Sequence, residues 1–231
     1  MPTEEFSDLL KEEAKVIWEA IFSHPFLKAI QCGTLPISQF SNYLCQDYHY
    51  LEGFARSAAL LLARAEDPGS LRLLSRRILT PVERSFHSHL FELLSLDLKI
   101  VEQVQLSPTN LAYTNHMLVT ASLGSGVGEG AAALLPCPWT YHELGQRLPR
   151  NPMNPNLPKI YREWIDFYDQ GFLVESVAAW RELVDTAAAT AGPSQLERMR
   201  KAFLTSCYYE FLFWEMAWHE EEWPNVGQNA N

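Results

Sequence analysis

The chain has 231 residues, of which 47% are hydrophobic and 20% charged, and its formal net charge at pH 7 is −10. This length and apolar content suffice for a substantial core and argue against an intrinsically disordered chain. Because phosphate binding needs a basic face, an acidic chain with only 18 Lys and Arg residues disfavours a nucleic-acid partner.

The sequence also indicates the cellular compartment. Its acidic N-terminus, MPTEEFSDLLKEE, lacks the basic and apolar parts of a signal peptide, and no window approaches the ~18 apolar residues of a membrane span. The cysteines, at positions 32, 45, 137 and 207, are too far apart for a CxxC pair. These features predict a cytoplasmic protein with reduced thiols and no membrane partner.

Helical periodicity extends over nearly the whole chain. The first predicted helix covers residues 3–22. The second has Ser38 as its N-cap and runs to Ala65, where the segment DPG at 67–69 ends it. Further helices are predicted at about 70–95, 107–133, 138–148, 157–167, 170–191 and 194–221.

Strand signals, by contrast, are nearly absent. Alternating apolar and polar runs are rare, and so are Asn-Gly and Asp-Gly turns. We therefore predict one all-α domain over residues 1–222. The proline-rich segment 149–158 is expected to be a surface loop, and residues 223–231 a frayed tail.

Two carboxylates occupy positions where an apolar residue is expected. Asp47 falls inside the apolar stripe of the second predicted helix, between Leu44 and Leu51. Glu210 interrupts the apolar segment SCYYEFLFWEMAW of the last predicted helix. An unpaired buried carboxylate costs on the order of several kcal/mol, so we predict that both belong to a functional site. A carboxylate satisfied by a Tyr hydroxyl or an Arg is the alternative.

An unusual cysteine lies in the segment AALLPCPWTYHE, residues 132–143. Pro138 fits the first position of a helix, where a missing N–H is tolerated, so Cys137 would lie near the N-cap. The orphan N–H groups and the helix dipole there can lower a thiol pKa from about 8.5 by a unit or more. We predict that Cys137 is a nucleophile. The alternative is a buried packing cysteine, the interpretation that suits Cys45 and Cys207.

Other patterns carry weaker signals. The spacing ExxxH occurs at Glu83/His87 and Glu215/His219, and we interpret Glu83/His87 as an exposed helix pair. The glycines between 124 and 130 lack the strand and the Lys-Ser or Lys-Thr of a phosphate loop, which favours close helix packing. A Gly-x-Ser-x-Gly elbow is absent, so no Ser-His-Asp triad is predicted.

Four blocks of sequence carry a resemblance to a known family. In chain order they are HPFLKAIQCGTLPISQFSNYLCQDYHYL, SPTNLAYTNHM, AALLPCPWTYHELG and SCYYEFLFWEMAW. Together they resemble the TenA family, also called thiaminase II, over roughly residues 10–222, nearly the whole chain. The resemblance implies a haem-oxygenase-like all-α helical bundle, a homotetramer, and no metal or organic cofactor.

The activity implied by the resemblance is that of an aminopyrimidine aminohydrolase, a hydrolase acting on C–N bonds. Such an enzyme converts 4-amino-5-aminomethyl-2-methylpyrimidine to the hydroxymethyl pyrimidine for thiamin salvage. It cleaves thiamin more slowly at the same methylene carbon. The retained Cys137 resembles the branch of the family that carries this thiol.

The resemblance also implies roles for seven residues. Cys137 in LLPC is the implied nucleophile, and Glu210 in YYEFLFW is the implied general acid. Asp47 in QDYHYL is implied to hold the amidine-like edge of the aminopyrimidine. The remaining implied substrate-binding residues are pocket tyrosines, of which the second hydrogen-bonds near the nucleophile: Tyr50, Tyr113, Tyr141 and Tyr168.

Three features depart from the family pattern. His49 stands where a tyrosine is frequent, next to the pocket side of its helix, and Pro138 replaces an aromatic or small residue. The glycine-rich stretch 124–130 is looser than expected. None of these departures removes a residue to which the resemblance gives a chemical role.

Two other functions stay open at this point. The first is a non-catalytic binding or regulatory protein that keeps a pyrimidine pocket, although a binder needs neither the thiol nor the acid. The second is a di-metal oxidase on the same fold, with ligands drawn from Asp47, Glu83, His87, His116, Glu210 and His219.

Overall fold

Helices form all the regular structure in the computed structural model, which describes residues 5–78, 82–148 and 155–226, with the backbone alone at 76–78 and 82. No described residue is in a strand, which confirms the predicted all-α class. The helices are α1 (Phe6–Glu13), α2 (Lys15–Phe22), α3 (Pro25–Cys32), α4 (Ile37–Arg64), α5 (Pro68–Ile78), α6 (Val82–Leu93), α7 (Leu98–Val101), α8 (Pro108–Leu123), α9 (Val127–Leu134), α10 (Pro136–Arg147), α11 (Lys159–Asp169), α12 (Val174–Thr190) and α13 (Pro193–His219). Among these described helices, none has the length and apolar character needed to cross a bilayer.

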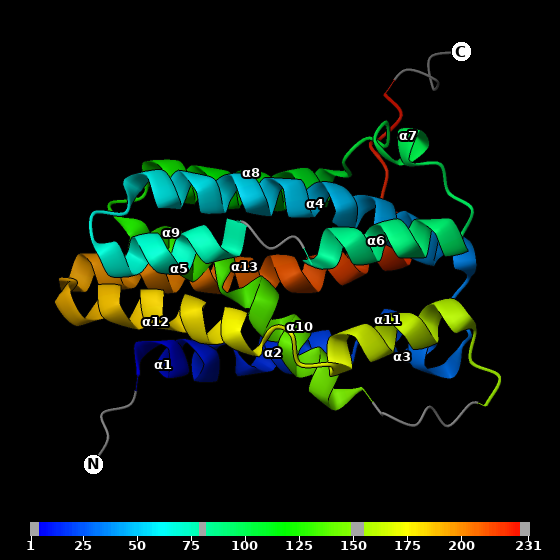
Figure 1. Ribbon diagram of the computed structural model, residues 1–231, viewed down its shortest axis with the longest axis horizontal. Coiled ribbons are helices and arrows are strands. Elements are labelled where there is room, and N and C mark those ends of the chain that lie inside the picture. Colours follow the sequence, from blue (N-terminus) through cyan, green and yellow to red (C-terminus); the bar gives the residue numbers. More distant parts are fainter. Residues whose placement is uncertain (1–4, 79–81, 149–154, 227–231) are drawn as a thin grey trace.

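The short helix α9 lies at the centre of the helical packing. It contacts α4, α8, α12 and α13, and α4 and α8 run side by side along one long edge of the molecule (Figure 1). A Cβ on Gly130 would lie 2.3 Å from Leu61 Cδ2, and one on Gly128 would lie 2.6 Å from Ala187 Cβ. These glycines therefore let α4 and α12 approach α9 closely, which confirms the packing interpretation of the glycine-rich stretch.

The structure divides two predicted helices at identifiable positions. The segment predicted at 3–22 is interrupted at the buried Ala14 (φ −79°, ψ −2°), which separates α1 from α2. The segment predicted at 107–133 ends first at Leu123, with Gly124 as its C-cap, and the Arg64 guanidinium binds carbonyl groups at this end of α8. Arg64 donates to the carbonyl oxygen of Ala121 at 2.5 Å and to that of Gly124. A free helix end is thereby satisfied before α9 begins.

Two helices were not predicted, and some predictions lie outside the described residues. The unpredicted helices are α3 and α7, while the helix predicted at 70–95 is divided into α5 and α6. The start at Thr3, the connection at 79–81, loop residues 149–154 and tail residues 227–231 lie outside the described part of the chain.

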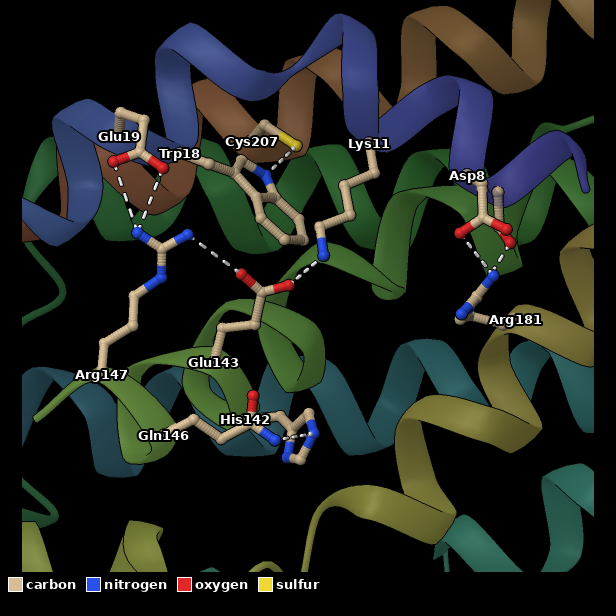
Figure 2. Close-up of polar contacts among 11 residues, drawn as sticks. Asp8, Lys11, Trp18, Glu19, His142, Glu143, Gln146, Arg147, Arg181 and Cys207 are labelled. Atoms are coloured by element: carbon tan, nitrogen blue, oxygen red, sulfur yellow. Dashed lines mark hydrogen bonds and ion pairs between the residues drawn. The ribbon is translucent and has the colours of Figure 1, made fainter. Parts of the chain in front are cut away.

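The N-terminal helices hold α10, the helix that carries Cys137, through a network of charges (Figure 2). Lys11 of α1 pairs with the Glu143 carboxylate of α10. Arg147, one turn further along α10, binds Glu143 at 3.5 Å and Glu19 of α2 at 3.1 Å. The Lys11 ammonium also lies 5.0 Å from the ring centroid of Trp139. Exposed pairs contribute only about 0–1 kcal/mol each, but this partly buried network fixes the position of α10.

A glycine on α10 sets the distance to α11. A Cβ on Gly145 would lie 2.1 Å from the backbone oxygen of Tyr168, so the two helices meet backbone to backbone at this point. The same contact brings Tyr168 next to Tyr141, with ring centroids 5.0 Å apart. Gly145 therefore positions one of the predicted pocket tyrosines.

We expect Gly145→Ala to lower the free energy of unfolding by about 1–3 kcal/mol, because a backbone atom cannot yield to the added methyl group as a flexible side chain could. Gly192→Ala is the matched control, since a Cβ there meets no atom within 4 Å. Denaturant titration of both variants measures the difference. Equal stability of Gly145→Ala and the wild type would contradict the backbone contact.

Candidate active site

Five helices bring the seven predicted site residues into one buried cluster. All seven are buried, at between 1% and 8% exposure. Their helices are those already described: α4 supplies Asp47 and Tyr50, α8 Tyr113, α10 Cys137 and Tyr141, α11 Tyr168, and α13 Glu210. Electrostatic interactions connect Cys137 to both carboxylates of the cluster, Glu210 and Asp47. Residues that are far apart in sequence thus share one site, and their chemical roles stay predictions.

Cys137 is the second residue of α10, and its environment differs from the one predicted. Pro136, not Pro138, holds the first helical position. Because both prolines lack an N–H, Cys137 alone offers a backbone N–H among the first three residues. Leu135 before them is itself helical (φ −59°, ψ −38°), so α10 follows α9 almost directly. The N-terminus of α10 therefore offers few of the backbone N–H donors that were expected to lower the pKa of Cys137.

Burial decides the protonation of this thiol. It raises the pKa of Cys137 well above the ordinary value, and the negative charge of Glu210 raises it further. A hydrogen bond from the Tyr50 hydroxyl to the sulfur opposes the increase only in part. The prediction of a lowered pKa is therefore wrong, because desolvation and the nearby carboxylates raise the pKa of this thiol. In the resting protein the Cys137 side chain is a neutral thiol.

Glu210 is the carboxylate whose charge acts most strongly on Cys137. Its Oε1 accepts a hydrogen bond from the Tyr113 hydroxyl at 2.5 Å, and its Oε2 accepts one from Thr140 Oγ1 at 3.3 Å. Burial raises the pKa of Glu210 to about 7, against the opposing effect of these two hydrogen bonds. The hydrogen bond from Tyr113 matches the alternative interpretation of this residue, in which a Tyr hydroxyl satisfies a buried carboxylate. A pKa near neutrality also suits a group that gives and takes a proton, so structural and chemical roles are compatible here.

Asp47 has a partner that the sequence analysis missed. His87 of α6 places its Nε2 2.9 Å from Asp47 Oδ2, and His87 is only 1% exposed. The interpretation of Glu83/His87 as an exposed helix pair is therefore wrong. His87 lies on the same face as the buried Leu90 and Phe91, at spacings of three and four, and that periodicity was the available signal.

Glu83, one turn before His87, is half-buried. Burial raises the pKa of Glu83 to about 7, the Asp47 carboxylate raises it further, and His87 opposes the increase. A third carboxyl group therefore interacts with the Asp47 side of the cluster.

Aromatic side chains enclose the polar groups. The Tyr43 and Tyr141 hydroxyls lie 2.9 Å apart, and the Tyr43 ring stacks on Trp214 with centroids at 5.3 Å. Tyr50 and Tyr113 have ring centroids 5.0 Å apart, on the side of Glu210. Tyr43 precedes Asp47 by four residues on α4, so it occupies the same face and was accessible to sequence reasoning. The site therefore combines flat apolar walls with a few acidic and hydroxyl groups.

Of the three histidines of the di-metal alternative, His87 pairs with Asp47, but the other two face residues outside that ligand set. His116 Nε2 lies 3.1 Å from Ser206 Oγ, and the exposed His219 lies 3.3 Å from Glu215. Within the described ranges, no three His, Cys, Asp or Glu side chains are grouped as a metal centre requires. His49, a departure from the family pattern, donates from Nε2 to the Val101 carbonyl oxygen at 2.9 Å and so holds α7.

Comparisons with known proteins show the family of the chain. Residues 11–220 match the TENA/THI-4/PQQC family. An aminopyrimidine aminohydrolase from Bacillus subtilis (strain 168) is 34% identical over 95% of this chain and 92% of its own length. The structure of a TenA homologue from P. horikoshii OT3 superposes with a TM-score of 0.83 at 34% identity, over 94% of this chain and 99% of the other.

A second structure, described as a TenA family transcription regulator from Silicibacter sp. TM1040, has the same TM-score of 0.83 at 28% identity and covers 94% of this chain and 97% of its own. All these matches span nearly the whole length of both partners. The chain is a member of the TENA/THI-4/PQQC family.

The raised pKa of Glu210 predicts a pH-dependent stability. The folded protein holds this proton with a pKa of about 7 and the unfolded chain releases it near 4.5, so the free energy of unfolding falls as pH rises through that window. Each pKa unit corresponds to about 1.4 kcal/mol, which gives on the order of 3 kcal/mol. Glu210→Gln lacks this titration. We therefore expect its free energy of unfolding, relative to that of wild type, to increase by that amount as the pH rises from about 5 to 8.

Denaturant titrations of both proteins at several pH values measure this gain. Glu182→Gln, which changes an exposed carboxylate, is the control. Parallel curves for Glu210→Gln and wild type would show that Glu210 does not titrate in this range.

Proposed function

We propose that this protein is an aminopyrimidine aminohydrolase of the thiaminase II type. It hydrolyses 4-amino-5-aminomethyl-2-methylpyrimidine to the 5-hydroxymethyl compound and ammonia, and acts on thiamin more slowly, in thiamin salvage. One observation carries the proposal: a buried thiol, an acid with a pKa of about 7 and a recognition carboxylate lie together in one aromatic site. The curated relative from Bacillus subtilis supports it.

Recognition of the pyrimidine rests on Asp47 and the aromatic walls. The carboxylate accepts from the exocyclic amino group and from a proton on the adjacent ring nitrogen, a two-point contact with one edge of the ring. The tyrosine rings, with Tyr141 and Tyr168 5.0 Å apart, offer flat surfaces to its faces. An aminopyrimidine has both features that this site complements.

Addition of sulfur to the ring comes next. The neutral Cys137 thiol must lose its proton as the C–S bond forms, and Glu210 in its ionised form is the base in reach of the cluster. The same proton is then available for a ring nitrogen, where it neutralises the charge that addition creates. With a pKa of about 7, Glu210 is populated in both forms at neutral pH.

Loss of the amine follows from the dearomatised ring. Its electron pair expels the amine from the 5-methylene carbon, and protonation of the nitrogen makes ammonia the leaving group. Water then adds to that carbon, and departure of the sulfur restores the aromatic ring. The net reaction exchanges one C–N bond for one C–O bond and consumes one water, so Cys137 and Glu210 return to their starting states.

Two further statements stay predictions: the homotetramer and the cytoplasmic location. The competing interpretation is a non-catalytic regulator, which the description of the Silicibacter relative favours. A regulator would bind the pyrimidine without releasing ammonia. The assay that detects ammonia therefore separates the two functions.

We expect the wild type to release ammonia from 4-amino-5-aminomethyl-2-methylpyrimidine in chelator-treated buffer. Cys137→Ala should lower kcat at least about a thousandfold, because the covalent route is lost. Cys45→Ala is the matched control, since Cys45 and Cys137 are both 8% exposed but Cys45 lies outside the proposed chemistry. Its kcat should stay within about threefold of wild type.

Three results would contradict the proposal. They are a folded wild type that releases no ammonia, a Cys137→Ala variant that stays active, and activity abolished by the chelator. Asp47→Asn should chiefly raise KM, since the proposal assigns that carboxylate to recognition.

A further inference from the structure

The contact between α4 and α6 holds a buried hydrogen-bonded pair, Asp47 and His87, and His87 has no assigned role. Asp47 Oδ2 and His87 Nε2 lie 2.9 Å apart, with the two residues 5% and 1% exposed. The imidazole packs beside Phe91, with ring centroids 6.0 Å apart. Tertiary packing therefore places the His87 ring against Oδ2 of Asp47, the carboxylate that is proposed to recognise the pyrimidine.

The second ring nitrogen defines the tautomer. His87 Nδ1 is buried and has no hydrogen-bond partner among the described residues. A doubly protonated ring would leave a charged N–H donor unsatisfied there, which costs more than an unpaired neutral acceptor. The ring is therefore neutral with its proton on Nε2, and that N–H donates to Asp47 Oδ2.

This donor determines what Asp47 offers to a ligand. With Oδ2 engaged by His87, the carboxylate is held in one orientation and acts as an acceptor only. Its ligand must supply two donors on adjacent atoms, as an exocyclic amino group beside a protonated ring nitrogen does. A 4-oxo pyrimidine would instead oppose a carbonyl oxygen to the carboxylate and be rejected.

We propose that His87 is a positioning residue that orients Asp47 for 4-aminopyrimidines carrying a proton on the neighbouring ring nitrogen. This inference deepens the proposed function and rests on it for the identity of the ligand. The pairing of His87 with Asp47 stands on the geometry of α4 and α6.

Three variants test the role of the ring. His87→Leu removes the donor, His87→Gln restores an N–H near the position of Nε2, and His89→Ala removes a histidine on the same helix that pairs with Glu163 at the surface. We expect His87→Leu to raise KM at least about tenfold with a smaller loss in kcat, and to weaken binding of the hydroxymethyl product to the same extent. His87→Gln should recover most of the loss in KM and in product binding, and His89→Ala should match wild type.

Binding is measured by calorimetry with the hydroxymethyl pyrimidine and with its 4-oxo analogue, so this arm does not depend on turnover. Product affinity unchanged in His87→Leu would overturn the proposal. Equal impairment in His87→Leu and His87→Gln would also overturn it, since packing alone would then explain the loss. A 4-oxo analogue that binds as tightly as the 4-amino compound would remove the specificity argument.

A nitrogen NMR spectrum of the histidine rings in the ligand-free protein tests the pair separately. We expect a neutral His87 ring with its proton on Nε2, identified by its disappearance in His87→Gln. A proton on Nδ1 alone would overturn the inference whatever the assays give. The expected tautomer and product binding in a wild type that releases no ammonia would overturn the proposed hydrolase alone. A wild type that neither hydrolyses nor binds would overturn both.

Discussion

Removal of ionisable side chains from water is the constraint on which the rest of the structure depends. Cys137, Glu210 and Asp47 are each at most 8% exposed, and an ion moved into such surroundings costs several kcal/mol unless it is neutralised or paired. Each residue meets this cost differently. Burial shifts the pKa of Cys137 and of Glu210 toward their protonated forms, whereas Asp47 accepts a hydrogen bond from His87. The aromatic core that imposes the cost also provides flat walls for a heterocycle.

The architecture serves this enclosure. The site residues come from α4, α8, α10, α11 and α13, and glycines at the helix contacts set how closely these helices approach. The N-terminal helices fix α10 from outside through Lys11 and Glu143 (Figure 2). Because the site residues belong to five different helices, small changes in helix packing change the pKa values of the buried groups. Stability and reactivity therefore depend on the same contacts.

Much of this arrangement could be predicted from sequence. Long segments with period 3.6 gave the helical class, and carboxylates inside apolar stripes marked Asp47 and Glu210 as buried. Helix α3 could also have been found, since Pro25 opens it and Gly33, at φ 70°, ends it.

Other features depend on tertiary structure and could not be predicted in this way. The turn at Ala14 has no Gly or Pro to mark it. The pairing of His87 with Asp47 joins two residues that are 40 positions apart in sequence and lie on different helices. For Cys137, the local helix terminus suggested a lowered pKa, while desolvation by distant helices raises it.

The most direct test of this account is the ionisation of Cys137 in the ligand-free protein. Thiolate absorbs in the ultraviolet, so the difference in absorbance between wild type and Cys137→Ser, followed from about pH 6 to 9, reports its titration. The account predicts no thiolate difference across this range, because the buried thiol stays protonated until a substrate is bound. A difference that grows with a midpoint near neutrality would contradict it and would show that the helix terminus, not desolvation, controls the nucleophile.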